Sequence, residues 1–395
     1  MSNPAAVTAA NAPTGALRPT PWSRLRDFGR PPRFMGLDLA RAIAIIGMAG
    51  AHMASFGEVN IWQPETYLGV VHGRSSILFA VLAGISVAIM TGRTNIPERE
   101  QMPRLRGKLF GRGVMIFLFG IFCELLAVPV AVILTFYGVL YIVVMPFLRL
   151  SVGALLTIAV VIAVFGPTIT AVLVAAGLGG GGFDFLIAGF YPLAVWLPLM
   201  LVGLAIGRLP LSSWRVAAGL ASVGAGISVL AYGVSAALNG AEGAAVEGPF
   251  NSDAVELRTP GEVVVHSLIA SYPHSGGTLE IFGSGGLVIA VIGVCLLLAR
   301  PLRWPLIPVA ALGSMPLTSY TGHLVIIVLV WGPWNLPHSS AAWAWTVLGL
   351  VLGCTVWMML FGRGPLEGIV KVASDAMVAD ARPVQQVTES VKKPI

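Results

Sequence analysis

The sequence predicts an all-α polytopic membrane protein with about ten transmembrane helices and both termini on the cytoplasmic side. Of the 395 residues, 56% are apolar and 11% are charged, whereas a soluble globular chain carries about 25% charged residues. Mean hydropathy is +0.85, and apolar runs of about 20 residues, long enough to cross a bilayer, recur along the chain. These observations exclude a soluble enzyme, a nucleic-acid-binding domain and a disulfide scaffold. The formal net charge of +6 is typical of Lys/Arg-rich cytoplasmic loops.

The apolar runs place the individual spans. The stretch from 112 to 148 is too long for one crossing and is divided near Pro129. The spans are expected at about 37–56, 75–92, 112–130, 132–148, 152–176, 188–207, 216–237, 279–299, 306–330 and 341–361.

The remaining segments differ from the spans in composition. Residues 1–32 are rich in Ala, Pro and Thr and then in Arg, which predicts a disordered basic arm before the ten-helix domain at 33–363. Residues 364–395 are polar, and we expect a disordered cytoplasmic tail. A long external loop is expected at 238–278. It could have a function, as long loops often do, or it could be a passive segment that covers the bundle on the solvent side.

The basic residues orient the chain in the membrane. With a cytoplasmic N-terminus, all of the 24 Lys and Arg residues except Arg74 and Arg258 fall on the inner side. Moving the register by one span would scatter them across both sides. The positive-inside rule therefore predicts that both termini are cytoplasmic.

The first expected span carries ionisable residues, which are costly in lipid and usually face a cavity or a pathway. Asp38 and Arg41 lie three residues apart on one helix face and can form an ion pair. Arg41 and His52 also share a face, about three turns apart, and Gly47 between them leaves room for another group. The alternative makes Arg41 an interfacial anchor and His52 a packing residue.

Polar residues also gather at two other spans. His72, Arg74 and Ser75 lie at the outer mouth of the second span, where a guanidinium beside a histidine suits substrate or oxyanion binding. A stray loop charge is the alternative for Arg74. In the ninth span, Tyr320 and His323 are expected to face a cavity.

Two further observations concern histidine and cysteine. His274, just before the eighth span, is an additional candidate for the cavity lining. Cys123, Cys295 and Cys354 each lie in an apolar run without a C-x-x-C pair, so we expect buried thiols and no metal site.

These motifs together resemble the transmembrane acyltransferase superfamily. Asp38 and Arg41, with His52 after ten intervening residues, resemble the R-x10-H opening span of its acyltransferase-3 branch. Segments similar to the heparan-α-glucosaminide N-acetyltransferase-like and YeiB-like bacterial branches are 72–84, 136–138, 191–192 and 203–208. Segments similar to the YeiB-like C-terminal half are 315–320 and 363–367.

The resemblance implies acyl transfer across a membrane. In such a reaction, cytoplasmic acyl-CoA donates an acyl group, acetyl being expected, to a hydroxyl or amine on an external sugar or glycolipid. His52 takes the place of the catalytic histidine and Arg41 that of the motif's arginine. The heparan-type branch has its essential histidine in the first external loop, which points to His72 instead. The choice of base between His52 and His72 stays open.

The basic segment before the third span supplies the expected donor site. Its residues Arg104, Arg106, Lys108 and Arg112 would attract the phosphates of coenzyme A, although a purely topological role fits the same charges. We expect a narrow tunnel past Arg41, Gly47 and Tyr320 to join this side to an external vestibule.

The expected partners follow from the same interpretation. They are the lipid bilayer of a bacterial plasma membrane, acyl-CoA as donor substrate, and an external sugar or glycolipid acceptor. No nucleic acid and no permanently bound cofactor are expected, and the sequence leaves open whether the chain forms a homodimer. The rival function is a small-molecule or lipid transporter or flippase with a polar site at the bilayer midplane.

Overall fold

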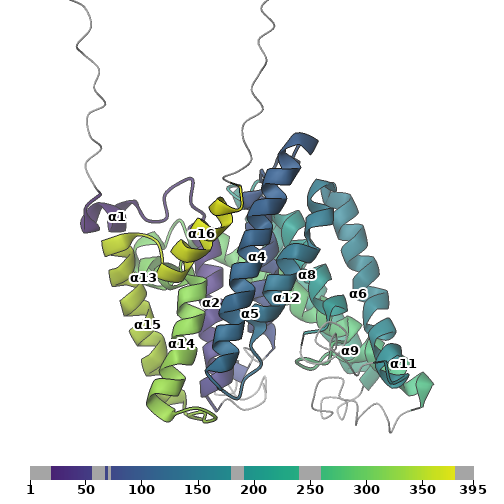
Figure 1. The fold of residues 1–395 in the computed structure, drawn as a ribbon. Helices are drawn as coiled ribbons and strands as arrows, with labels where there is room; N and C mark the ends of the chain where they lie inside the picture. Colours follow the sequence, from purple (N-terminus) through teal and green to yellow (C-terminus); the bar gives the residue numbers. More distant parts are fainter. Residues whose placement is uncertain (1–18, 56–66, 70–72, 179–190, 240–258, 379–395) are drawn as a thin grey trace, which may run out of the picture.

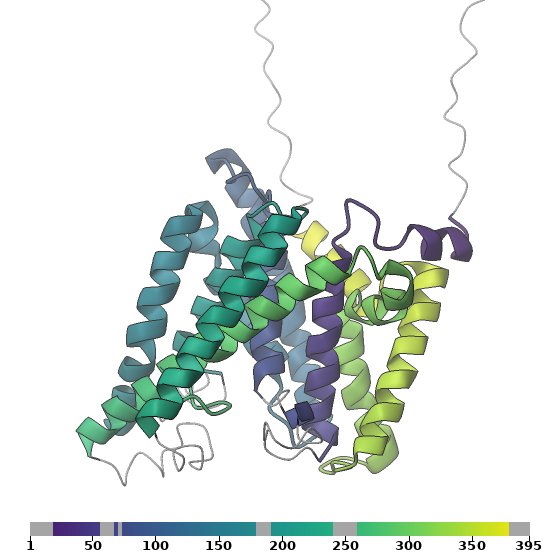
Figure 2. The same cartoon turned by 180° about the vertical axis from the view of Figure 1, so that it is seen from behind.

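The protein is a bundle of helices, shown in Figures 1 and 2 by a computed structural model. It describes residues 19–55, 67–69, 73–178, 191–239 and 259–378, and this part of the chain contains helices and no strand. The helices are α1 (Pro21–Asp27), α2 (Met35–Met53), α3 (Arg74–Met90), α4 (Met102–Leu125), α5 (Ile133–Val143), α6 (Val152–Ala175), α8 (Leu193–Gly207), α9 (Trp214–Asn239), α11 (Pro260–Ile269), α12 (Thr278–Leu298), α13 (Arg303–Gly313), α14 (Pro316–Trp331), α15 (Ser340–Phe361) and α16 (Pro365–Ala376).

Each predicted span overlaps a helix or a helix pair. The ninth is a pair, because α13 and α14 meet at an angle of 70°. Among the described helices, α6, α9, α12 and α15 are long and apolar enough to cross a membrane, and the bent pair could be a fifth span. The all-helical fold is confirmed, while the count of ten spans stays a prediction.

The first and last described helices, α1 and α16, lie at the same end of the bundle, as an even number of crossings requires (Figures 1 and 2). We call this the α16 end. Whether it faces the cytoplasm stays a prediction that rests on the distribution of basic residues.

The expectation of a disordered N-terminal arm is wrong for residues 21–27, which form α1. The Thr20 hydroxyl caps this helix by accepting the Ser23 N–H at 3.2 Å, and Pro21 occupies the first turn. Arg24 of α1 donates to the carbonyl groups of Met359 and Leu360 in α15. These carbonyls at the end of α15 lack helical partners, so they can hold the short helix in place.

The expectation of a disordered tail is also wrong, for residues 365–376. They form α16, which packs against α4 and buries Val370 and Ser374. The Ser374 hydroxyl donates to the Lys108 carbonyl at 2.7 Å. The helix is amphipathic: one face is polar and the other is buried. The polar face made the segment resemble a solvated tail in composition.

Close packing between α3 and α8 depends on two glycines. A Cβ added to Gly84 would lie 2.0 Å from the Met200 oxygen, and one added to Gly203 would lie 2.0 Å from the Val81 oxygen. Because both obstacles are backbone atoms, they cannot rotate away. Small residues that allow helices to approach closely are typical of membrane bundles, where van der Waals packing drives association.

Gly203→Val is therefore expected to separate α3 from α8 and to destabilise the protein by about 3 kcal/mol, seen as a lower unfolding temperature in detergent. The matched control is Gly226→Val in α9, where an added Cβ meets nothing within 4 Å. Both variants place a β-branched residue in a helix, so the cost of that change cancels. Equal unfolding temperatures for the two variants would contradict the packing interpretation.

Candidate active site

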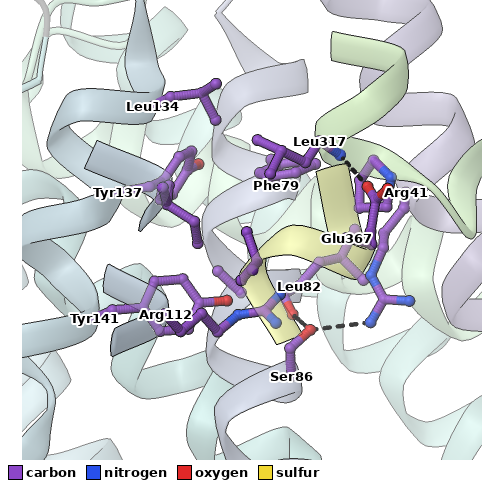
Figure 3. Close-up of a pocket in the computed structure, with 14 residues that line it drawn as sticks. Arg41, Phe79, Leu82, Ser86, Arg112, Leu134, Tyr137, Tyr141, Leu317 and Glu367 are labelled. Carbon is purple, nitrogen blue, oxygen red and sulfur yellow. Dashed lines mark hydrogen bonds between the residues drawn. The ribbon is translucent and has the colours of Figure 1, made fainter. Parts of the chain in front are cut away.

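An ion cluster around the buried Asp38 lies where α2 begins. The Asp38 carboxylate accepts from Arg33 Nε at 2.5 Å and from Arg41 Nη1 at 2.8 Å, and Asp38 is 3% exposed. The predicted pairing of Asp38 with Arg41 is confirmed. Arg41 Nη2 also donates to the Ser86 hydroxyl of α3 at 3.0 Å (Figure 3). The guanidinium is thus held between two helices.

Arg41 lines an inter-helix cavity of about 70 Å³, the Arg41 cavity (Figure 3). Most of its wall is apolar or aromatic, and two further charges, Arg112 and Glu367, border it. The Arg112 guanidinium lies over the Tyr141 ring, 5.3 Å from its centroid, and its buried Nε has no hydrogen-bond partner in the described part of the chain. Other lining residues include Phe79, Leu82, Leu134, Tyr137 and Leu317.

A larger cavity of about 520 Å³, the basic cavity, adjoins the Arg41 cavity, because Arg112 and Glu367 line both. Its charged lining residues are Arg33, Lys108, Arg112, Arg363, Lys371, Glu367 and Asp375. Lys371 donates to Asp375 at 2.6 Å, and this hydrogen bond lowers the pKa of the Asp375 carboxyl from its usual value. Even with both carboxylates ionised, basic groups dominate the wall.

Glu367 connects α16 to the first turn of α14. Its carboxylate accepts from the Leu317 N–H at 2.7 Å, the Thr318 N–H at 3.1 Å and the Thr318 hydroxyl at 2.6 Å. A negative charge at a helix N-terminus satisfies free N–H groups and interacts favourably with the helix dipole. Glu367 therefore fixes the helix that carries Tyr320 and His323.

Two histidines from distant parts of the chain form a pair. His52 Nδ1 in α2 lies 3.0 Å from His323 Nε2 in α14, and the ring planes differ by 20°. His323 is fully buried, and Tyr320 packs edge-on against it with ring centroids 5.1 Å apart. Because Nδ1 of His52 is engaged, Nε2 is the nitrogen that this histidine can offer to a substrate.

His52 borders a cavity of about 50 Å³, the His52 cavity, near the end of α2 opposite to Arg41. Tyr320 belongs to its wall, and the buried hydroxyl of this tyrosine makes no hydrogen bond of acceptable geometry in the described residues, although the Ile133 backbone lies beside it. Other polar residues of the wall are Ser75, Ser76, Tyr191 and His274.

The loop that carries His274 is held by a buried carboxylate. Glu280 accepts from the His274 N–H and the Gly276 N–H, each at 2.7 Å, and from the Ser275 hydroxyl at 3.0 Å. His274 adopts a φ of 62°, in the left-handed region that non-glycine residues rarely occupy. The hydrogen bonds to Glu280 thus stabilise the strained backbone conformation of His274, which lines the same cavity as His52.

Several predicted residues lie elsewhere. Gly47 is buried in α2 and is not part of the walls of these cavities. Arg74 donates from Nε to the Tyr232 hydroxyl at 3.1 Å, away from the His52 cavity. Arg104 and Arg106 are exposed and do not line the basic cavity, and His72 lies outside the described residues.

The sequence model for the catalytic region of heparan-alpha-glucosaminide N-acetyltransferase matches residues 33–235. The chain belongs to this family. The predicted resemblance is thereby confirmed, and it suggests a membrane acetyltransferase. No curated protein sequence matches the chain.

The acetyltransferase family match covers only part of the site. Asp38, Arg41 and His52 lie inside the matched region, whereas Tyr320 and His323 lie beyond it. Sequence reasoning assigned no role to Ser76, Tyr191, Glu280 and Glu367, which line or support the cavities. Tyr191 and Glu367 do fall in segments similar to the family, a signal that could have singled them out. Within the described ranges, no group of three His, Cys, Asp or Glu residues could hold a metal ion, and the three cysteines are buried and free.

Asp38→Asn is expected to leave two guanidinium groups without their common anion, at a cost of about 3 kcal/mol in stability. The control is Asp27→Asn, which removes an exposed ion pair to Arg30 at 2.8 Å and should change stability by less than about 0.5 kcal/mol. Thermal unfolding of both purified variants measures the difference. A wild-type unfolding temperature for Asp38→Asn would show that the cluster is not needed for stability.

Proposed function

We propose that this protein transfers an acetyl group from acetyl-CoA in the cytoplasm to a hydroxyl or amine on the outer side of a bacterial plasma membrane, with a sugar or glycolipid as acceptor. One observation carries the proposal: the wall of the His52 cavity contains both His52 and the buried Tyr320, whose hydroxyl donates no hydrogen bond within the described residues. Acyl transfer needs a base for the nucleophile and a donor for the oxyanion. His52 and Tyr320 can fill these two roles.

The reaction follows from these positions. The acceptor O–H or N–H loses its proton to His52 Nε2 as its oxygen or nitrogen attacks the thioester carbonyl. The carbonyl oxygen becomes an oxyanion, and the Tyr320 hydroxyl donates a hydrogen bond to it. The intermediate then expels the coenzyme A thiolate, which takes the proton from His52. The products are the acetylated acceptor and free coenzyme A.

The cavities suggest how the donor reaches His52. The basic cavity suits the phosphates of coenzyme A, and the Arg41 cavity, which adjoins it, suits the thin pantetheine arm. Tyr137 lines the Arg41 cavity, and its hydroxyl donates at 2.9 Å to the carbonyl of Ser76, which lines the His52 cavity. In this proposal, Tyr137 moves aside when the thioester enters.

His52→Ala is expected to lower acetyl transfer by at least about 100-fold, the contribution of a general base. The assay uses purified protein in liposomes with radiolabelled acetyl-CoA and glucosamine-terminated oligosaccharides as acceptors. The matched control is His338→Ala, which changes an exposed histidine that does not line the His52 cavity.

Full activity of His52→Ala would exclude His52 as the base and would leave His72 as the candidate base. Uptake of labelled sugar into the liposomes, without any acetylated product, would instead favour the transporter.

Arg112→Gln is expected to raise the KM for acetyl-CoA by about 10-fold, since one charge-assisted phosphate contact is worth about 1.5 kcal/mol, and to leave the KM for the acceptor unchanged. Arg104→Gln, which removes an exposed charge outside the basic cavity, should leave both constants unchanged. Equal effects of the two variants would show that the basic segment acts through overall charge, as a topological determinant would.

A further inference from the structure

We propose that His323 is a positioning residue that holds His52 in the tautomer with hydrogen on Nδ1, so that the lone pair of Nε2 faces the His52 cavity. His323 does not touch the substrate in this arrangement, since its Nε2 is occupied by His52. The catalytic meaning of the arrangement rests on the proposed acetyl transfer. The hydrogen-bond arrangement itself can be tested without it.

The direction of the hydrogen bond follows from the backbone around His323. Its buried Nδ1 makes no hydrogen bond of acceptable geometry in the described part of the chain, and the backbone carbonyl groups that act on this imidazole are those of Ser319 and Tyr320, a turn earlier in α14. Carbonyl oxygens only accept hydrogen bonds, so Nδ1 of His323 carries the hydrogen. In a neutral imidazole, Nε2 is then the acceptor.

This assignment determines the tautomer of His52. The 3.0 Å contact between His52 Nδ1 and His323 Nε2 requires one hydrogen between the two atoms. Because His323 Nε2 accepts, His52 Nδ1 donates, and the basic lone pair of His52 is on Nε2. The opposite tautomer would place two lone pairs against each other in a buried site, which forfeits the hydrogen bond and leaves two polar atoms unsatisfied.

The ring geometry supports a hydrogen bond over simple stacking. The ring centroids are 5.3 Å apart while the two nitrogens are 3.0 Å apart. The rings therefore meet nitrogen to nitrogen, edge to edge, in planes only 20° apart, and do not overlap face to face. An N–H in the plane of one ring thus points along the lone pair of the other.

The surroundings of His323 prevent it from turning. Its side chain is fully buried, and Tyr320 packs against it edge-on. The Ser319 hydroxyl donates to the Leu312 carbonyl of α13 at 3.2 Å, and Glu367 caps the first turn of α14. A partner held this firmly can orient an imidazole, as the buried carboxylate of a Ser-His-Asp triad does.

The test compares two variants of His323. His323→Leu removes the acceptor, and a kcat lower by about 100-fold or more is expected with the KM for acetyl-CoA within about two-fold, since an incorrectly oriented imidazole loses general-base catalysis. His323→Gln can present its amide oxygen to His52 Nδ1 and should recover kcat to within about 10-fold of wild type. Thr321→Val, a buried neighbour in α14, is the packing control and should change neither kcat nor the tautomer.

Nitrogen-15 NMR of labelled histidine reads the tautomer directly, with the His52 signals assigned by their loss in His52→Asn. Wild type and His323→Gln should show hydrogen on Nδ1 of His52, and His323→Leu should show a mixture or hydrogen on Nε2. Hydrogen on Nε2 of His52 in the wild type overturns the proposal, even if no variant folds. Equal kcat for His323→Leu and wild type also overturns it.

The two proposals can fail separately. If the wild-type protein shows the expected tautomer but transfers no acetyl group, the acetyltransferase proposal fails while the pairing of the histidines stands. If acetyl transfer depends on His52 but not on His323, the positioning role fails while the acetyltransferase proposal stands.

Discussion

Lipid offers no hydrogen bonds, so polar side chains inside a membrane bundle need hydrogen-bond or ion-pair partners from the bundle itself. The candidate site depends on the partners that the polar side chains of α2 have. At its first turn, Asp38 balances Arg33 and Arg41; near its last turn, His52 pairs with His323. Helix α13 also packs closely at the first turn, where a Cβ on Gly313 would lie 1.8 Å from the Asp38 carbonyl oxygen. Close helix packing thus restricts the conformations of the Asp38 ion cluster.

The two halves of the chain contribute unequal parts of this arrangement. The region matched by the acetyltransferase family supplies α2 and α3, with Arg41, His52 and Ser76. The remainder supplies α14 with Tyr320 and His323, and α16 with Glu367, which caps α14. The pair of His52 and His323 and the wall of the His52 cavity each combine residues from both parts. The site therefore needs both halves, although the family match covers only the first.

Local patterns explain which parts of the fold could be predicted. Apolar runs of bilayer length located the ten helices or helix pairs, and the spacing of Asp38, Arg41 and His52 indicated one helix face. The same reasoning missed α16, because its polar face resembles a solvated tail, and it missed the 70° bend between α13 and α14, because composition continues across the break. The early start of α4 at Met102 was missed because its basic first turns lack an apolar run.

The sequence by itself determined that the chain is a helical membrane protein, that Asp38 can neutralise Arg41, and that His52 shares their helix face. These properties depend on residues within a few turns of one another, where helical geometry dictates the neighbours. Tertiary structure alone decided that His323 is the partner of His52, 271 positions away, that Tyr320 enters the same cavity, and that Arg74 does not. No local spacing encodes such contacts, since they arise from the way separate helices pack around a shared polar interior.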